Sequence, residues 1–379
     1  RPARGDVAQS VERGSHKPRV GGSSPPIATN SHQPSRLAYD PRVPNDSSPG
    51  SPGPGSLRDA FSRHLAATGL LDGATALVAS CSGGGDSNAL LVLLAGEAKL
   101  RGIPLLGFHV DHQLRGAEGH RDARAAADLA AALDLSFVFR SFPVRELRHT
   151  GESLESAARR LRYESLLALG RDLGPGTLLA TGHTLEDQAE TVLLHLERRL
   201  GRSRGGVRAR RSDGVVRPLL PFRREDLRDF LRAEGIPWRE DASNTDERFA
   251  RNRIRHRVLP GLEARWPGVT ARLARAAEAL TGRLARIDAR IEAALASHAA
   301  PLEGPWPRAL LTGLERESAG RLLVRAAGGD GRRPGRAQVD RILDRLAAGE
   351  PAFREAFAGR RIAADRLTVR LTPPARLIP

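Results

Sequence analysis

Ala74–Ser87, with the sequence ATALVASCSGGGDS, decides the fold of this chain. Its first six residues form an apolar run next to a glycine, which predicts a buried strand. The next eight, SCSGGGDS, hold three consecutive glycines that let the backbone turn tightly and point its N–H groups inward. A helix is expected from about Ser87 to Leu100, and the positive end of its dipole favours a phosphate at the turn. A glycine-rich turn alone is often no more than a turn, so the neighbouring residues must decide.

Asp86 makes this turn unusual. The Walker A pattern is absent, because no GK[ST] follows the glycines, and an acid stands where that pattern has its lysine. A carboxylate beside a phosphate is unfavourable unless a cation lies between them, so Asp86 predicts bound Mg²⁺. The alternative is that Asp86 and Ser87 only cap the helix, and the two roles can coexist.

Strand and helix patterns alternate on both sides of this turn. Strands are predicted at 74–79, 104–110, 136–142 and 177–181. Helices are predicted at 57–69, 87–100, 117–133, 152–173 and 185–196. Such alternation predicts an α/β fold, with a mainly parallel, doubly wound, Rossmann-like sheet and helices on both faces. Ligands of such sheets bind beyond the carboxyl ends of the strands, where the polar motifs of this chain lie.

Composition divides the chain into four segments. Residues 1–56 are rich in Ser, Pro and Gly, so we expect disorder, and the run from Val7 to Asn30 resembles a translated tRNA gene. We therefore expect an artefactual extension upstream of a true start near Ser56. The α/β domain is predicted over 57–257. A helical substrate-binding domain over 258–345 and a small C-terminal segment over 346–379 are predicted to follow.

The formal net charge of +16 and the sequence pI near 11.3 favour a polyanionic partner, either nucleic acid or an anionic membrane surface. No apolar stretch approaches the roughly 20 residues of a membrane span, so we expect a cytoplasmic, nucleic-acid-associated protein with no membrane partner. The single cysteine, Cys81, excludes an intramolecular disulfide, a CxxC redox pair and a cysteine-ligated iron–sulfur cluster. The oligomeric state stays open, a homodimer included.

Five motifs then carry a resemblance. SGGGDS resembles the PP-loop of the ATP-pyrophosphatase superfamily, whose members cleave ATP between its α- and β-phosphates. The other four motifs follow in order: FHVDHQLR at 108–115, ARRLRY at 158–163, TGHTLEDQAET at 181–191 and WREDASNTDERFARNRIRH at 238–256. Together they resemble the tRNA(Ile)-lysidine synthetase family, over about residues 70 to 265.

This resemblance implies a reaction with ATP, free lysine and an isoleucine tRNA that has a CAU anticodon. ATP would adenylate the oxygen on carbon 2 of the wobble cytidine, and pyrophosphate would leave. The ε-amine of lysine would then attack that carbon and expel AMP. Adenylation is needed because the cytosine oxygen is a very poor leaving group, and the ε-amine, with an ordinary pKa of about 10.4, must first lose a proton.

The resemblance also assigns residues to ATP. Arg159 and Arg162 would offset charge that develops on the phosphates, although a solvated basic helix face is the alternative. His109 and His112 would form hydrogen bonds near the nucleotide rather than bind a metal. The remaining ATP ligands belong to the loop, where Asp86 would also hold Mg²⁺: Ser82, Gly83, Gly84, Gly85, Asp86 and Ser87.

The lysine substrate is assigned to the end of the strand predicted at 177–181. Asp187 and Glu190 lie three residues apart on one helix face beside His183, and two acids suit the ammonium group of lysine and could accept its proton. The alternative is that they only stabilise the helix dipole, together with Glu186. This chain departs from the family's usual pair of aspartates at Glu186 and from its frequent histidine at Thr184.

Transfer RNA carries phosphates over its whole surface, so we expect its arginine contacts to cluster away from the small-molecule pocket. A solvated surface rich in arginine for reasons of base composition is the alternative. The candidate contacts are Arg208, Arg251, Arg253, Arg255 and Arg257.

Three rival functions are weaker. A tRNA thiolase of known design needs paired cysteines or an iron–sulfur cluster, which one cysteine cannot supply. An amide-forming synthetase usually carries a glutaminase module, and nothing in this chain resembles its nucleophile. A non-catalytic RNA-binding protein would gain nothing from acids at Asp86, Asp187 and Glu190.

Overall fold

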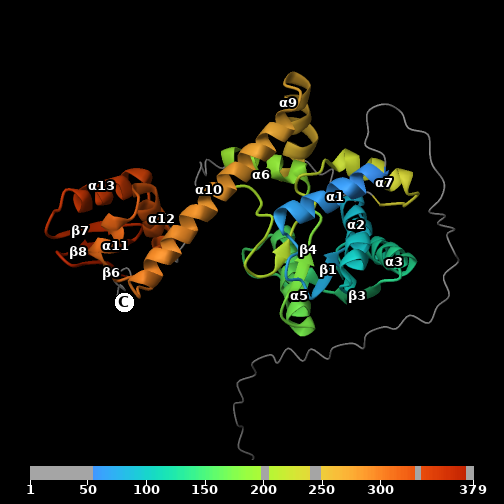
Figure 1. Cartoon of the computed structure of the whole chain (residues 1–379), viewed down its shortest axis with the longest axis horizontal. Coiled ribbons are helices and arrows are strands. Elements are labelled where there is room, and N and C mark those ends of the chain that lie inside the picture. Colours follow the sequence, from blue (N-terminus) through green and yellow to red (C-terminus); the bar gives the residue numbers. More distant parts are fainter. Residues whose placement is uncertain (1–53, 198–204, 240–248, 329–333, 373–379) are drawn as a thin grey trace, which may run out of the picture.

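The computed structural model describes residues 54–197, 205–239, 249–328 and 334–372. The segment predicted to be disordered lies outside the described residues up to position 53. Also outside the described residues are 198–204, 329–333, part of the motif at 238–256 (240–248) and the end of the predicted C-terminal segment (373–379). Figure 1 shows two bodies joined by the long helix α10 (Val269–Ser297), of which the larger holds the glycine-rich turn.

The larger body is built on a five-stranded parallel sheet of order β3-β2-β1-β4-β5. The strands are β1 (Ala76–Ser80), β2 (Leu105–Asp111), β3 (Ser136–Ser141), β4 (Thr177–Ala180) and β5 (Val215–Val216). The chain winds outward from β1 to β3 and then returns to β4 on the other side of β1. The carboxyl ends of β1 and β4 therefore flank the point where the strand order reverses, which is where such sheets bind ligands.

Helices cover both faces of this sheet, as alternate strand residues require. Leu77 and Ala79 belong to a core with α1 (Pro54–Thr68), α2 (Gly85–Arg101), α3 (Ala117–Ala132) and α7 (Arg224–Ala233). Val78, on the opposite face, packs in a second core with Leu166 of α5 (Leu154–Leu173). The short helix α4 (Val144–Leu147) precedes α5. The predicted doubly wound α/β fold is confirmed.

Helix α6 (Leu185–Glu197) follows β4 and packs along α10. Between α7 and α10 the chain forms α8 (Ala250–Arg253), a π-helical turn η3 (Ile254–Val258) and α9 (Leu259–Arg265). The turn η3 also contacts α6, so the basic segment predicted at 251–257 lies against the acidic helix. Turns of the π type widen a helix locally and are frequent at functional sites.

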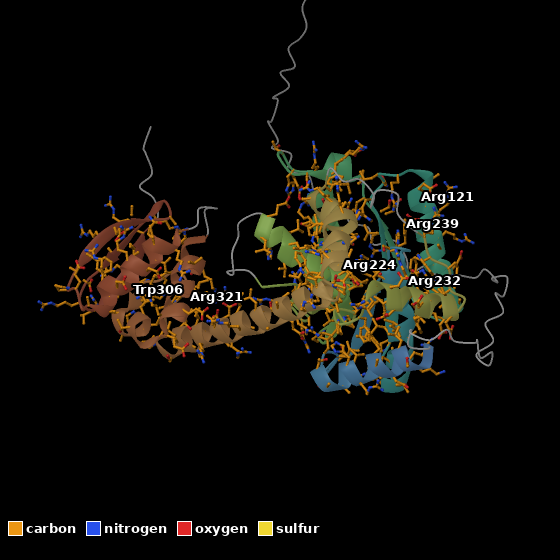
Figure 2. All side chains as sticks on the ribbon, turned by 90° about the horizontal axis from the view of Figure 1, so that it is seen from above. Arg121, Arg224, Arg232, Arg239, Trp306 and Arg321 are labelled. Carbon is orange, nitrogen blue, oxygen red and sulfur yellow. The ribbon has the colours of Figure 1, made fainter. Side chains whose placement is uncertain are left out.

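The smaller body has its own core around Trp306, Ile342 and Phe357, with Ile291 of α10 among its members (Figure 2). Its helices are α11 (Arg308–Gly313), α12 (Arg316–Ala327) and α13 (Arg336–Ala347). Its antiparallel sheet has the order β6-β9-β8-β7, formed by β6 (Trp306–Pro307), β7 (Phe353–Phe357), β8 (Arg360–Ala364) and β9 (Thr368–Thr372). Three of these strands, β7, β8 and β9, lie in the predicted C-terminal segment at 346–379. The domain boundaries at 257 and 345 stay predictions.

Candidate active site

The glycine-rich turn is held open by its own hydrogen bonds. The hydroxyl of Ser87 donates to the carbonyl of Gly84 at 2.9 Å and accepts from the backbone N–H of Ser82 at 3.1 Å. Gly83 has a φ of +84°, and a β-carbon there would lie 3.3 Å from the backbone oxygen of Asp122. Because L residues avoid this conformation and the space is tight, glycine is required at 83.

A segment distant in sequence packs over this turn. The N–H of Arg239 donates to the carbonyl of Gly83 at 3.0 Å, and its guanidinium Nε lies 2.6 Å from Asp122. The ring of Trp238 lies beside Gly85, where an added β-carbon would come within 3.4 Å of it. Figure 2 labels Arg239 at the end of this segment. The turn is thus held from outside as well as from within.

Two acids face the turn from α6. Asp187 and Glu190 are both buried, and Glu190 has no exposed surface at all. Asp187 accepts hydrogen bonds from the N–H of Thr184 at 2.8 Å and from its hydroxyl at 3.2 Å, which fixes the carboxylate at the first turn of the helix. Asp187 therefore lies in the first turn of α6, where it can also stabilise the helix dipole, and its Oδ1 takes no part in the bonds to Thr184.

Arg224 of α7 connects these acids to the turn. Its Nε donates to Asp86 at 3.0 Å, and its Nη2 lies 3.8 Å from both Asp187 and Glu190. Its backbone N–H also donates to Glu186 at 3.0 Å. One guanidinium thus spans the carboxyl ends of β1 and β4. Sequence analysis did not single out Arg224, since it lies in an ordinary basic helix start far along the chain from Asp86.

Arg251 and Arg255 complete the cluster. Arg251 reaches Asp187 at 2.7 Å and Glu190 at 2.8 Å, while Arg255 reaches Glu190 at 2.6 Å and Asp187 at 3.3 Å. We expected these two arginines to lie away from the small-molecule pocket, and that expectation is wrong. Residues four apart share one helix face, and the buried carboxylates draw that face inward. Their contact with tRNA stays a prediction.

The other predicted tRNA contacts lie outside this cluster. Arg253 pairs with Glu197, and Arg257 is exposed. Arg208 is exposed and lies 3.3 Å from Asp288 of α10. All three are therefore closer to the expected open surface than Arg251 and Arg255 are.

Burial and the neighbouring arginines have opposite effects on the pKa of each carboxylate, and the balance differs between Asp86 and Asp187. Burial raises the pKa of Asp86, with Arg224 opposing the rise. Burial would also raise the pKa of Asp187, but Arg251 and Arg224 outweigh it and hold that pKa well below its ordinary value. Asp187 therefore stays ionised and suits the binding of a cation more than the acceptance of a proton.

Asp86 can serve as a ligand of Mg²⁺ only together with other oxygen atoms. Within the described residues, no group of three or more His, Cys, Asp or Glu side chains is arranged to hold a metal ion. The Oδ2 atom of Asp86 accepts from Arg224, whereas Oδ1 has no hydrogen-bond donor in that part of the chain. Mg²⁺ is commonly bound by one or two carboxylates plus substrate phosphates and water, so the site fits Mg²⁺ brought by a nucleotide.

Three histidines near the carboxyl ends of β1, β2 and β4 are neutral. The Nδ1 of His109 lies 2.8 Å from the carbonyl of Cys81, and that of His183 lies 3.0 Å from the hydroxyl of Thr181. Burial lowers the pKa of His183 to about 3 and that of His112 to about 4, where Arg162 adds to the effect. The Nδ1 of His112 is buried without a partner in the described residues. None of these rings carries a charge near neutral pH.

Tyr163 gathers the predicted pair of arginines on α5. The guanidinium carbons of Arg159 and Arg162 lie 5.0 and 5.6 Å from the centre of its ring. Arg211 lies 5.3 Å from the same ring, and Arg217 donates to its hydroxyl at 3.5 Å. Sequence analysis did not predict the last two, although Arg217 directly follows β5 at the carboxyl end of the sheet.

A cavity of about 230 Å³ opens beside the acid cluster. Ligand pockets for drug-sized molecules span roughly 300–1,000 Å³, so this one suits a molecule the size of an amino acid. Its Glu263 is engaged elsewhere, since it accepts from Thr270 at 2.6 and 2.9 Å. Its lining residues are Glu186, Glu190, Arg223, Arg224, Arg255, Leu259, Pro260, Glu263 and Thr270.

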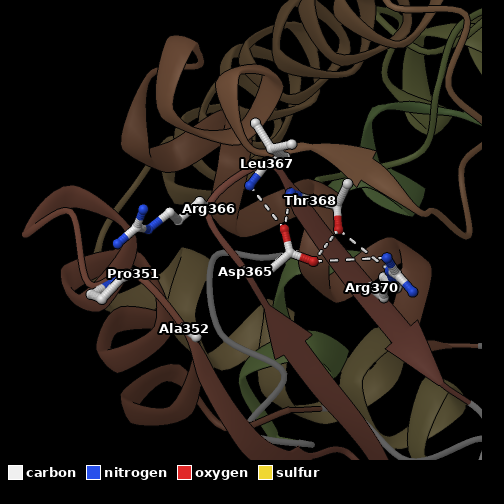
Figure 3. Close-up of a pocket in the computed structure, with 7 residues that line it drawn as sticks. All are labelled: Pro351, Ala352, Asp365, Arg366, Leu367, Thr368 and Arg370. Carbon is white, nitrogen blue, oxygen red and sulfur yellow. Dashed lines mark hydrogen bonds and ion pairs between the residues drawn. The ribbon is translucent and has the colours of Figure 1, made fainter.

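A larger cavity, of about 490 Å³, lies on the small sheet of the other body (Figure 3). Its one carboxylate, Asp365, accepts from the N–H groups of Leu367 and Thr368 at 2.8 and 2.7 Å. Asp365 therefore serves the turn between β8 and β9. This hollow lies apart from the carboxyl ends of the parallel sheet, so we assign the chemistry to the smaller cavity.

The model of one protein family, described as the PP-loop domain, matches residues 58–262, which is more than half of the chain. The chain belongs to the PP-loop domain family. The glycine-rich turn is its PP-loop, and the matched region contains Asp86, the acid cluster and its three arginines. Among the described residues, no helix has the length and apolar content needed to cross a bilayer.

Three of the similar curated proteins are each named tRNA(Ile)-lysidine synthase. That of Solibacter usitatus is 43% identical over 203 residues, covering 52% of this chain and 43% of the relative. That of Alkalilimnicola ehrlichii is 40% identical over 250 residues, covering 63% and 54%. That of Geobacter sulfurreducens is 37% identical over 285 residues, covering 72% and 59%. The chain spans about half the length of the curated relatives it matches.

Among solved structures, a U34-tRNA thiolase from Methanococcus maripaludis with its [4Fe-4S] cluster aligns with 59% of this chain and 78% of its own. The TM-score is 0.48 and the sequence identity is 17%.

Proposed function

We propose that this protein uses ATP to join free lysine to carbon 2 of the wobble cytidine of isoleucine tRNA with a CAU anticodon, forming lysidine. The observation that carries the proposal is Arg224, which spans from Asp86 in the PP-loop to Asp187 and Glu190 on α6. A nucleotide site and a cation site are thereby adjacent. The names of the relatives support the same reaction.

In the first step, the oxygen on carbon 2 of the cytidine attacks the α-phosphorus of ATP. The bond between the α- and β-phosphates breaks, and pyrophosphate leaves. The PP-loop N–H groups and the N-terminus of α2 would hold the phosphates. Mg²⁺ held by Asp86 would neutralise charge on the phosphate oxygens. Ser82 and Ser87, which hydrogen-bond to each other, would keep the loop in its binding conformation.

In the second step, the ε-amine of lysine attacks carbon 2, and AMP leaves with the former carbonyl oxygen. The cavity beside the acid cluster suits lysine because it offers both signs of charge. Glu190 would bind an ammonium group and Arg255 a carboxylate, with Leu259 and Pro260 beside the aliphatic chain. The depressed pKa of Asp187 makes it a binding group, so the proton of the ammonium must pass to another base.

Guanidinium groups pair with the acids of the cluster. Arg224, Arg251 and Arg255 face Asp86, Asp187 and Glu190, so the cluster is balanced before lysine arrives. Lysine brings one carboxylate against its two ammonium groups, so it adds less positive charge to the cluster than a diamine without the carboxylate does. We therefore expect lysine to bind more tightly than an amine of similar length that has no carboxylate.

Thiol chemistry has little support from this site. Cys81 is the one cysteine of the chain, and it is buried with its sulfur directed at the carbonyl of Ala79 at 3.2 Å. Burial raises the pKa of the Cys81 thiol to about 12, which leaves almost no thiolate near neutral pH.

Because its substrates are ATP, lysine and tRNA, we place the protein in the cytoplasm.

The proposal is tested by incubating the protein with α-labelled ATP, Mg²⁺ and a tRNA(Ile) transcript, with and without lysine. We expect one pyrophosphate per tRNA without lysine, and release of AMP only after lysine is added. A transcript with an altered wobble base is the control and should give neither product. Production of ADP, or AMP release that does not depend on tRNA, would overturn the proposal.

A further inference from the structure

The side chains around Tyr163 form a cationic cluster that lies apart from the PP-loop. Its members are Arg159, Arg162, Arg211 and Arg217. Arg211 also pairs with Asp213. Within the described ranges, the other three arginines have no carboxylate within ion-pairing distance. Four guanidinium groups around one phenol repel one another, so the arrangement is stable only if an anion or solvent offsets them.

Arg217 is the most constrained member. It is 4% exposed, its Nη1 donates to the carbonyl of Arg208 at 2.5 Å, and its Nε has no hydrogen-bond acceptor among the described residues. A buried guanidinium with an unsatisfied donor costs free energy unless a ligand supplies the acceptor. Such a group is rarely kept for packing alone.

The electrostatics of Tyr163 agree with this reading. Burial alone would raise the pKa of Tyr163, but Arg159 and Arg217 outweigh it and hold the pKa below its ordinary value. Burial lowers the pKa of Arg162, and the charges of Arg159 and Arg251 act in the same direction. The local potential is therefore strongly positive, in contrast to the balanced acid cluster.

The position of this cluster selects the kind of anion. Arg217 follows β5, two strands from β1, and strands in a sheet lie about 4.8 Å apart, so the end of β5 lies roughly 10 Å from the end of β1 along the sheet edge. Arg208 and Arg210, which precede Arg217 along the chain, are exposed. A base that reacts at the PP-loop must be splayed from its strand, and its phosphodiester groups then lie to one side of it.

We propose that Arg217, Arg211 and Tyr163, together with Arg159 and Arg162, bind a backbone phosphodiester of the RNA next to the nucleotide that reacts. The inference rests on the proposed function in taking tRNA as the ligand. The phosphates of ATP are the other source of the same chemistry. They already have the PP-loop, the α2 N-terminus and Asp86, whereas the cluster opens toward exposed arginines, as a polymeric anion requires.

The test measures binding, without lysine and without turnover. The variants are Arg217→Lys, which keeps the charge but loses the planar fork, and Arg211→Ala. Arg124→Ala is the control, because Arg124 is an exposed arginine of α3, paired with Asp128, and lies outside the predicted substrate-binding domain. The probes are a CAU anticodon stem–loop, the same RNA with one neutral methylphosphonate at each linkage around the target cytidine, and ATP alone.

We expect both cluster variants to weaken RNA binding about tenfold, while ATP affinity stays within about twofold. Arg211→Ala, which removes a charge, should also lower the salt dependence by roughly one phosphate contact, whereas Arg217→Lys should leave the salt dependence unchanged. One methylphosphonate position should weaken wild-type binding about tenfold and the Arg217→Lys protein much less. The Arg124→Ala protein should match the wild type in every arm. If Arg217→Lys does not fold, Arg211→Ala carries the comparison.

Two outcomes would overturn the inference. A loss of ATP affinity with unchanged RNA affinity would assign the cluster to the nucleotide. Unchanged affinity for both, with a lower free energy of unfolding, would make the cluster structural. Failure of lysidine formation is a separate result, since RNA binding in this test needs no catalysis.

Discussion

The free-energy coupling between Glu190 and Arg255 tests the acid cluster at its most buried point. Glu190 is fully buried and accepts from Arg255 Nε at 2.6 Å and Nη2 at 3.0 Å. In Glu190→Gln, Arg255 loses its closest carboxylate and keeps the charge of Asp187 at 3.3 Å, although the amide oxygen can still accept a hydrogen bond. Breaking a buried ion pair by removing one partner costs about 3–5 kcal/mol. Because the Arg255 side chain keeps 22% exposure, water relieves part of this, and we expect about 2–3 kcal/mol.

The assay is a double-mutant cycle with Glu190→Gln, Arg255→Gln and the double variant, measured by urea unfolding. The double variant removes both charges, so its loss in free energy of unfolding should be smaller than the sum of the losses of the two single variants. We expect a coupling free energy of about 1–2 kcal/mol. The matched cycle is Arg232→Gln with Glu225→Gln, an exposed pair at 3.0 Å whose coupling should stay below about 1 kcal/mol. A buried pair whose coupling is no larger than that of the exposed pair would refute the reasoning.

Three further changes probe the site. Asp86→Asn should stop pyrophosphate release without changing the circular dichroism spectrum, whereas the exposed Asp72→Asn should change neither; residual pyrophosphate release above a few per cent would contradict the assigned role. The imidazole of His183, whose pKa is lowered to about 3, is neutral in the folded protein. Its contribution to the free energy of unfolding is therefore largest above about pH 6.5 and is lost as the pH falls toward 3. Between about pH 6.5 and pH 4, the free energy of unfolding of His183→Gln should therefore fall by up to about 3 kcal/mol less than that of the wild type. Equal pH dependence of the two proteins would argue against this role of His183. Gly83→Ala should cost about 1–3 kcal/mol because its φ is +84°, while Gly85→Ala should cost less; equal melting temperatures would contradict the strain.

The parts of the fold that were predicted correctly depend on local pattern. Ala74–Ser87 reads as strand, turn and helix because an apolar run, three glycines and a helix start follow one another within fourteen residues. The same periodicity predicted β2, β3 and β4 to within one or two residues. By contrast β5, with two residues, is too short to show any alternation, and its place in the sheet depends on pairing with β4.

The parts of the site that were not predicted depend on distant contacts. Arg224 lies 138 residues from Asp86 along the chain, and nothing in its own neighbourhood marks it as the link to the PP-loop. Arg251 and Arg255 were recognised as basic but were expected to face RNA. Only the packing of η3 against α6 shows that they lie on the inner face of their segment. Residue type could suggest the chemistry of each group, but not which opposite charge it meets.

The most direct test of the proposed reaction is nucleoside analysis of tRNA(Ile) after incubation with the purified protein, ATP, Mg²⁺ and isotopically labelled lysine. We predict a cytidine that carries one lysine through its ε-nitrogen, formed with one AMP per modified nucleoside and lost in Asp86→Asn. Unmodified cytidine after complete consumption of ATP, or a labelled product with lysine attached elsewhere, would contradict the account.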